Sequence, residues 1–284
     1  MTVSQTRPPA AIVDDPAVPP TRQHRSLGAL LGKANVLTGF VILIAIWELA
    51  PRLGLIDQEA FSPFSVVVRR LVHLAGTSGF WLEARSTLRT WALGLAISTV
   101  AGLALAVLIA VIPGARRYTH STIEFLRPIP SVALIPAVIL VVGTKYESGV
   151  VLITYAALWP MLLQTLAGFD DIDSVARDTA RSFRFPLRLM ATDLIWPSVL
   201  PYFFTGLRIS ASVALVLGVT GEMVIGTVGL GQGIALAQNA GDTPTMYALV
   251  LVTGLLGVLI NIVFRAIERR SLRWHTSVRS LEAL

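Results

Sequence analysis

The sequence contains no cysteine and only two lysines among its 284 residues, and both shortages restrict what the protein can do. Without cysteine there is no disulfide framework and no thiolate ligand for a metal. Lys33 and Lys145 both lie outside any G-x-x-x-x-G-K-S/T loop, so the chain has no such loop to hold ATP. The four histidines are scattered and form no metal or catalytic cluster. We therefore expect no enzyme, no catalytic residue, no metal site and no cofactor bound directly by this chain.

Charged residues are also scarce, at 14% of the chain, against about 25% in soluble domains. Hydrophobic residues make up 54%, and the mean hydropathy is +0.70. Both values indicate a protein embedded in membrane lipid. The net charge of +6 does not indicate a nucleic-acid partner, because the basic residues are not gathered in a soluble domain with interleaved aromatic residues.

Six apolar stretches are long enough to cross a membrane, for which a helix needs about 20 residues. They are residues 35–51, 90–112, 120–142, 149–168, 199–225 and 244–264. Most lysines and arginines fall on the side that also holds both termini, and the positive-inside rule places that side in the cytosol. The predicted fold class is all-α and integral to the membrane, with six transmembrane helices and both termini cytosolic.

The chain divides into four predicted parts. Residues 1–28 are rich in Pro, Asp, Arg and Thr without a hydrophobic period, which predicts a disordered cytosolic tail. Residues 29–81 hold the first transmembrane helix and an outer segment. Residues 82–267 form the core transmembrane domain, and residues 268–284 form a cytosolic C-terminal tail.

The outer segment contains a predicted amphipathic helix. Ser62 and Pro63 are typical of a helix start, with serine as the cap and proline in the first position. Apolar residues then recur at helical spacing, at Phe64, Val67 and Leu71. Such a helix either lies on the outer membrane surface or packs on the helix bundle.

A polar segment from Phe169 to Ile195 separates two of the apolar stretches. Asp171 and Asp173 lie where a helix would begin, and Phe185 followed by Pro186 predicts a turn. Four arginines occur in this segment, namely Arg177, Arg181, Arg184 and Arg188. We predict a short charged helical hairpin, at about residues 170–195, that docks a soluble partner. Ordinary positive-inside charge is the alternative explanation of the arginines.

Prolines and charges interrupt the apolar stretches at several positions. Pro128, Pro130 and Pro136 break the third stretch, which predicts a kink that either shapes a pathway wall or only packs the bundle. Charge inside a span is costly. We expect Arg208 to snorkel to the cytosolic end of its helix, and Glu222 to contact the pathway or a dimer interface near the outer end.

The run Gly229-Leu230-Gly231-Gln232-Gly233 follows the fifth apolar stretch. It is a weak nucleotide fingerprint, because it follows a membrane span rather than a strand. A tight outer turn, or close backbone packing near a gate, is the prediction for Gly229 and Gly231.

From about Leu82 to Arg279 the chain resembles the permease subunit of a binding-protein-dependent ABC importer, in the branch that includes sulfonate, taurine and nitrate permeases. Several runs carry this resemblance in the expected order. They are Phe125-Leu126-Arg127-Pro128-Ile129-Pro130, Trp196-Pro197-Ser198-Val199-Leu200-Pro201, Thr205-Gly206-Leu207-Arg208 and Gly221-Glu222-Met223, followed by the glycine run.

The resemblance implies a MetI-like ABC permease fold in a bacterial plasma membrane. It implies three kinds of partner, namely a cytosolic ABC ATPase subunit that binds the ATP, an extracytoplasmic solute-binding protein and a second permease copy in a homodimer. It places Pro128, Pro130 and Pro136 in the translocation path, and Glu222 with its glycines near the outer gate. The implied solute is a small organic anion such as a sulfonate, or nitrate. The alternatives are a pyrimidine-type vitamin precursor or, in another class, an ion-coupled secondary transporter.

The resemblance also assigns the hairpin to coupling with the ATPase. The family signature Glu-x-Ala-x-x-x-Gly falls on Asp178, Ala180 and Arg184, so the acid is shortened and the glycine is replaced. Pro186 is expected to make the turn that the glycine normally eases, and Arg181 is expected to take part in docking.

Overall fold

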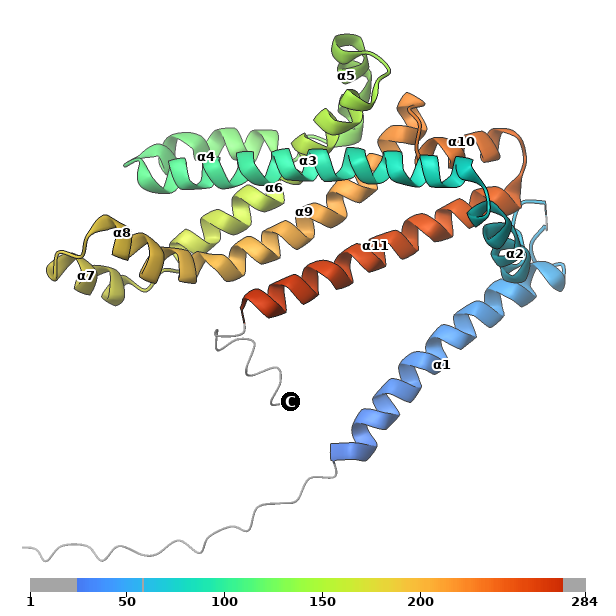
Figure 1. Ribbon diagram of the computed structural model, residues 1–284, viewed down its shortest axis with the longest axis horizontal. Helices are drawn as coiled ribbons and strands as arrows, with labels where there is room; N and C mark the ends of the chain where they lie inside the picture. Colours follow the sequence, from blue (N-terminus) through green and yellow to red (C-terminus); the bar gives the residue numbers. More distant parts are fainter. Residues whose placement is uncertain (1–24, 58, 273–284) are drawn as a thin grey trace, which may run out of the picture. The chain divides into compact units, whose positions relative to one another are not determined.

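The computed structural model describes residues 25–57 and 59–272, with side chains from Thr38 onward (Figure 1). The chain divides into two units after Trp47. The first unit holds most of α1 (Arg25–Arg52), which contains the first expected span. The expected tails lie largely outside the described residues, although α1 already begins at Arg25.

Every regular element in the described part of the chain is a helix. After α1 they are, in order, α2 (Phe64–Ala75), α3 (Ser78–Val111), α4 (Ala115–Leu126), the 3-10 turn η1 (Ser131–Leu134), α5 (Ile135–Val142), α6 (Tyr146–Asp170), α7 (Ser174–Ser182), α8 (Leu187–Leu189), the π-helical turn η2 (Met190–Ile195), α9 (Trp196–Ile225), α10 (Leu230–Asn239) and α11 (Thr243–Ser271). Among the described residues, four helices are long and apolar enough to cross a membrane: α3, α6, α11 and the continuous stretch Leu187–Ile225.

The third expected span, residues 120–142, is not one continuous helix but is interrupted where the prolines predicted a kink. The pair formed by α4 and residues 131–142 is bent by 80° and adds a fifth span only if it is counted as one. Proline lacks the N–H that a helix interior needs, and its ring clashes with the preceding turn. Pro128 and Pro130 therefore separate the two parts. Pro136 lies in the first turn of α5, where proline is tolerated, so it starts a helix rather than breaking one.

The core consists of α6 packed between α3 and α9 (Figure 1). Glycines bring these helices together. A Cβ on Gly102 would lie 3.0 Å from the Met161 side chain, and a Cβ on Gly206 would lie 3.0 Å from Gln164. Such small residues let helix backbones approach where lipid provides no hydrophobic driving force. The buried Ser210 hydroxyl donates to the carbonyl of Ala157 at 2.7 Å and joins α9 to α6.

Helix α2 packs on the bundle rather than standing apart from it. Val67 is fully buried, and Leu71 packs against a buried cluster that includes residues of α10 and α11. The prediction of Ser62 as the cap was wrong by one position, because α2 begins at Phe64 and Pro63 occupies the N-cap position without a side-chain hydrogen bond. The carboxylate of Glu48 instead accepts a hydrogen bond from the Ser65 amide at 2.8 Å, which satisfies one of the free N–H groups of the first turn.

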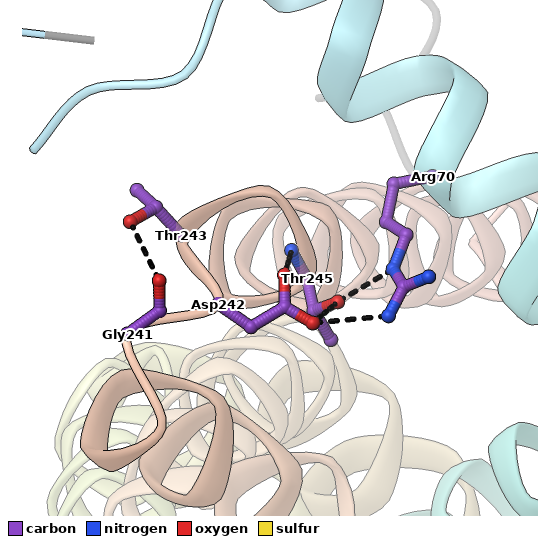
Figure 2. A network of polar contacts seen from close by, with 5 residues as sticks. All are labelled: Arg70, Gly241, Asp242, Thr243 and Thr245. Carbon is purple, nitrogen blue, oxygen red and sulfur yellow. Dashed lines mark hydrogen bonds and ion pairs between the residues drawn. The ribbon is translucent and has the colours of Figure 1, made fainter. Parts of the chain in front are cut away.

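A polar network fixes α2 to the start of α11 (Figure 2). The Arg70 guanidinium donates to the Asp242 carboxylate at 2.9 Å and to the Thr245 hydroxyl at 2.6 Å. Burial opposes ionisation of Asp242, but hydrogen bonds from Thr245 and the charge of Arg70 outweigh it and lower the Asp242 pKa. The carboxylate therefore stays ionised at neutral pH, and its stabilising contribution is lost only as the pH falls through this lowered pKa.

Candidate functional site

A buried carboxylate lies near the C-terminal end of α9, at the end of the bundle opposite the polar hairpin (Figure 1). Glu222 is only 2% exposed. Its Oε2 accepts hydrogen bonds from the Thr87 hydroxyl at 2.9 Å and from the Gly231 amide at 3.0 Å. The Thr87 oxygen also accepts from the Leu230 amide at 2.9 Å. Thr87 and Glu222 thus hold the first two N–H groups of α10, and this outer latch joins α3, α9 and α10.

Glycine is required where α10 passes over this carboxylate. A Cβ on Gly231 would overlap the Val219 carbonyl oxygen and lie 2.8 Å from the Glu222 Cβ, while a Cβ on Gly229 would overlap the Glu222 carboxylate. The predicted close backbone packing is therefore found. The predicted tight turn is made by Gly226, whose φ of 78° is left-handed and ends α9.

Glu222 is enclosed by α3, α9 and α10 within the subunit. Its second oxygen, Oε1, is buried and has no hydrogen-bond partner among the described residues. Such an atom loses its hydration without compensation. The carboxylate is thus directed at α10, and any effect that it has on transport passes through the position of that helix. Thr87 was not predicted, since nothing in the sequence links it to a residue 135 positions away.

Replacing Thr87 with valine should loosen the outer latch. Valine has the same shape but no hydroxyl, so the Leu230 amide loses its partner, at about 1–3 kcal/mol for a buried unsatisfied group, and Glu222 Oε2 keeps only the Gly231 amide as donor. We expect a lower Tm of the purified protein and slower uptake after reconstitution. Thr87→Ser keeps the hydroxyl and should behave like the wild type. Equal Tm and uptake in the two variants would show that the hydrogen bonds do not hold α10.

The kinked segment borders a cavity of about 520 Å³ that Arg127 and Pro128 line. Two contacts fix α4 against α6 at this point. The Tyr155 hydroxyl donates to the Leu126 carbonyl at 2.8 Å, and Arg116 forms an ion pair with Asp170. Pro130 and Pro136 do not line this cavity. Of the three prolines that were predicted to shape the pathway, only Pro128 therefore lies at this cavity.

The polar hairpin is formed by α7 and α8 and projects from the shared end of α6 and α9 (Figure 1). The Asp173 side chain caps α7 by accepting from the Val175 amide at 2.9 Å. Helix α7 ends at Ser182, and two residues later Arg184 adopts a left-handed φ of 51°. The Phe185 amide donates to the Ala180 carbonyl at 2.9 Å, and the Arg184 amide donates to that of Arg181 at 3.0 Å. This is the Schellman arrangement that normally contains glycine.

The turn is therefore made by Arg184 itself, before the chain reaches Pro186. Arg184 adopts a left-handed conformation. The signature glycine would adopt this conformation without strain, because it has no Cβ. Pro186 follows with extended backbone at the start of α8. The expectation that Pro186 makes this turn was wrong, because Arg184 itself adopts the positive φ.

The hairpin exposes both basic and apolar side chains. Ala180 is buried against the rest of the hairpin, whereas Asp178, Arg181 and Arg184 are exposed. Large apolar side chains are exposed beside them on the same short segment, namely those of Val175, Phe183 and Leu187. An exposed apolar group surrounded by charge is typical of a surface that binds another protein.

Arg208, in the first half of α9, has a partner that the sequence did not indicate. Its guanidinium lies 3.5 Å from the Glu268 carboxylate on α11, so it is paired rather than only snorkelling. Over the described residues, no group of three or more His, Cys, Asp or Glu side chains is placed to hold a metal ion.

The helix arrangement is similar to that of solved ABC transporter chains. A chain of the MetNI methionine ABC transporter, in an inward-facing crystal form, superposes with a TM-score of 0.57 at 20% identity, over 73% of this chain and 96% of that one. At this identity the likeness establishes the fold alone. The family described as binding-protein-dependent transport system inner membrane component matches residues 98–273, more than half of the chain. The chain belongs to this family, and the membership predicted from the sequence is confirmed.

Curated relatives cover most of the chain. It is 27% identical to the nitrate import permease protein NrtB of Leptolyngbya laminosa, over 88% of this chain and 95% of that protein. It is 28% identical to the taurine transport system permease protein TauC of Escherichia coli K12, over 84% of this chain and 88% of that protein. A formylaminopyrimidine transport permease of Halalkalibacterium halodurans is also 28% identical, over 83% of this chain and 93% of its own length. The chain is thus a multi-pass inner-membrane permease component of an ABC importer.

Proposed function

We propose that this chain forms the translocation path of an ATP-driven importer for a small oxyanion, an organic sulfonate or nitrate. The observation that carries the proposal is the α7–α8 hairpin at the shared end of α6 and α9, with Arg181 and Arg184 exposed beside apolar side chains. A cytosolic ABC ATPase would bind this hairpin, which supports a cytosolic location for this end of the bundle and for both termini.

The packing of α6 and α9 supports a mechanical role for the hairpin. Helix α6 leads into the hairpin, and the continuous helical stretch Leu187–Ile225 leads from the hairpin to Glu222. The Tyr202 hydroxyl also donates to Asp171 at 2.8 Å and fastens the base of the hairpin to α9. ATP-driven movement of the hairpin would therefore move α6 and α9 as one body and alternate access between two packings of a permease dimer.

The kinked segment supports the location of the pathway. Pro128 and Arg127 line a cavity of about 520 Å³, and within the described residues the Arg127 guanidinium has no ion-pair or hydrogen-bond partner. An unpaired guanidinium beside a broken helix is suited to a passing oxyanion, since it forms charge-assisted hydrogen bonds. Glu222, Gly229 and Gly231 would act at the opposite end, where the outer latch sets the position of α10.

The relatives support a solute with an oxyanion group, because nitrate is an oxyanion and taurine carries a sulfonate group. The formylaminopyrimidine permease keeps a vitamin precursor as the alternative. A separate solute-binding protein would select among them, and this chain would accept what that protein delivers.

The test begins with affinity purification of the tagged chain from native membranes after mild crosslinking, followed by mass spectrometry. We expect an ABC ATPase and an exported solute-binding protein. The recovered binding protein is then screened for a thermal shift with an alkanesulfonate, taurine, nitrate and formylaminopyrimidine. A shift with the pyrimidine alone would replace the proposed solute while keeping the importer. Recovery of neither partner from well-expressed, intact protein would contradict the coupling role and favour an ion-coupled transporter.

A further inference from the structure

A groove of about 930 Å³ runs between α9 and α11. Its walls include the apolar side chains of Val216 and Val258, both more than half exposed. Gly254 and Gly257 form its floor on α11. Such glycines usually allow a neighbouring helix to approach, but a Cβ added to Gly254 would meet nothing within 4 Å. The groove is therefore an apolar slot that no other described element fills.

The groove is basic at one end only. Arg208 and Arg265 lie there, together with Ser212 and Asn261. This is the end of α9 and α11 that lies towards the hairpin (Figure 1). Glu268 offsets the charge of Arg208 at 3.5 Å. The Arg265 guanidinium, by contrast, has no ion-pair or hydrogen-bond partner over the part of the chain that the structure describes, and Arg265 is exposed.

We propose that this groove binds one anionic phospholipid. The phosphate would lie between Arg265 and Arg208, near the Ser212 hydroxyl and the Asn261 amide, and an acyl chain would lie along Gly257 and Gly254. A guanidinium is the preferred cation for a phosphate. Basic pockets between transmembrane helices on the cytoplasmic side bind the headgroups of anionic lipids. A free phosphate would use only the basic end, whereas a phospholipid matches both the charge and the apolar length.

The site has a consequence for transport, because it joins two helices of different function. Helix α9 carries the hairpin at one end and Glu222 at the other, while α11 is anchored to α2 through Asp242 and Arg70. A lipid between α9 and α11 contacts both, so its occupancy favours one packing of the pair over another. We therefore expect uptake to depend on anionic lipid.

The test measures lipid retention in the purified full chain and does not depend on the solute or on the ATPase. The protein is reconstituted in nanodiscs of phosphatidylcholine, alone or mixed equally with phosphatidylglycerol, and the lipids that it retains are counted by native mass spectrometry. We expect the wild type to retain phosphatidylglycerol preferentially. Arg265→Gln should retain it about fivefold less, the factor expected for removing one basic side chain near an anionic headgroup. Arg269→Gln removes an exposed arginine of the same helix outside the groove lining and should not differ from the wild type.

A second variant tests the apolar part of the groove. Gly254→Phe fills the slot from a position with free space around it, and we expect it to lose phosphatidylglycerol with an unchanged Tm. Equal retention in Arg265→Gln and Arg269→Gln would overturn the proposal. So would retention of phosphatidylcholine and phosphatidylglycerol in equal amounts by the wild type. Loss of a crosslinked dimer in Gly254→Phe, with lipid retention unchanged, would also overturn it and assign the groove to a second copy of the chain.

Discussion

Replacement of Gly231 with alanine is expected to abolish uptake and to lower the Tm of the purified protein. The added Cβ would overlap the Val219 carbonyl oxygen, which belongs to the backbone of α9 and cannot rotate away. Relief requires α10 to move outwards, and that movement breaks the 3.0 Å hydrogen bond from the Gly231 amide to Glu222. Overpacking costs about 1–3 kcal/mol, and the buried carboxylate then loses a donor, for about 1–3 kcal/mol more.

The measurement is uptake of the identified solute into vesicles that contain the complete transporter, alongside Tm in detergent. A loss of about 1 kcal/mol lowers Tm by about 2–4 °C in a domain of 150–250 residues. Gly79→Ala is the matched control, because Gly79 lies on α3 in the same half of the bundle and an added Cβ there meets nothing within 4 Å. If Gly231→Ala transports as well as Gly79→Ala, the close contact between α9 and α10 is not needed for function.

Hydropathy predicted the long helices well and their ends poorly. The apolar stretches 149–168 and 244–264 lie within α6 and α11. Helix α3, however, begins at Ser78 rather than near residue 90, because its first turns continue past the apolar part and contain Arg85 and Arg89. A hydropathy window measures the thickness of lipid that a helix crosses and not the length of the helix. Proline similarly predicted a break near Pro128 but not a bend of 80°, which depends on the neighbouring helices.

The sequence predicted the part of the candidate site where only the absence of a side chain matters. Glycine at 229 and 231 predicts close packing whatever the partner is, and close packing is found. The partners themselves were not predictable. Thr87 and Glu268 look like any threonine near an apolar run and any acid near a helix end, and only the packing of distant helices brings them to Glu222 and Arg208. Conversely, Arg184 was read as a charge, whereas the structure gives it a conformational role as well.

Those two roles of Arg184 are separable by experiment. Reversing the charge with Arg181→Glu and Arg184→Glu together is expected to reduce recovery of the ATPase by more than about tenfold, since opposed like charges cost several kcal/mol at an interface. Arg184→Gly also removes a charge, but it relieves a left-handed arginine, a conformation that costs about 1–2 kcal/mol for an L-residue. Glycine also raises the conformational entropy of the unfolded chain, which offsets about 0.4–1 kcal/mol of this gain in stability. We therefore expect Arg184→Gly to retain the ATPase and to match or slightly exceed the wild type in Tm.

Arg184→Ala completes the series, because it loses the charge and keeps the strain. It should have a lower Tm than Arg184→Gly, and the difference isolates the conformational role of this position. The matched control for the reversal is Arg117→Glu with Arg269→Glu, which changes two exposed arginines outside the hairpin by the same amount. Recovery of the ATPase is measured after solubilisation without crosslinker, with equal amounts of each permease variant. If both double reversals reduce recovery equally, or neither does, the hairpin arginines serve only as positive-inside charge, and docking rests on the exposed Val175, Phe183 and Leu187 instead.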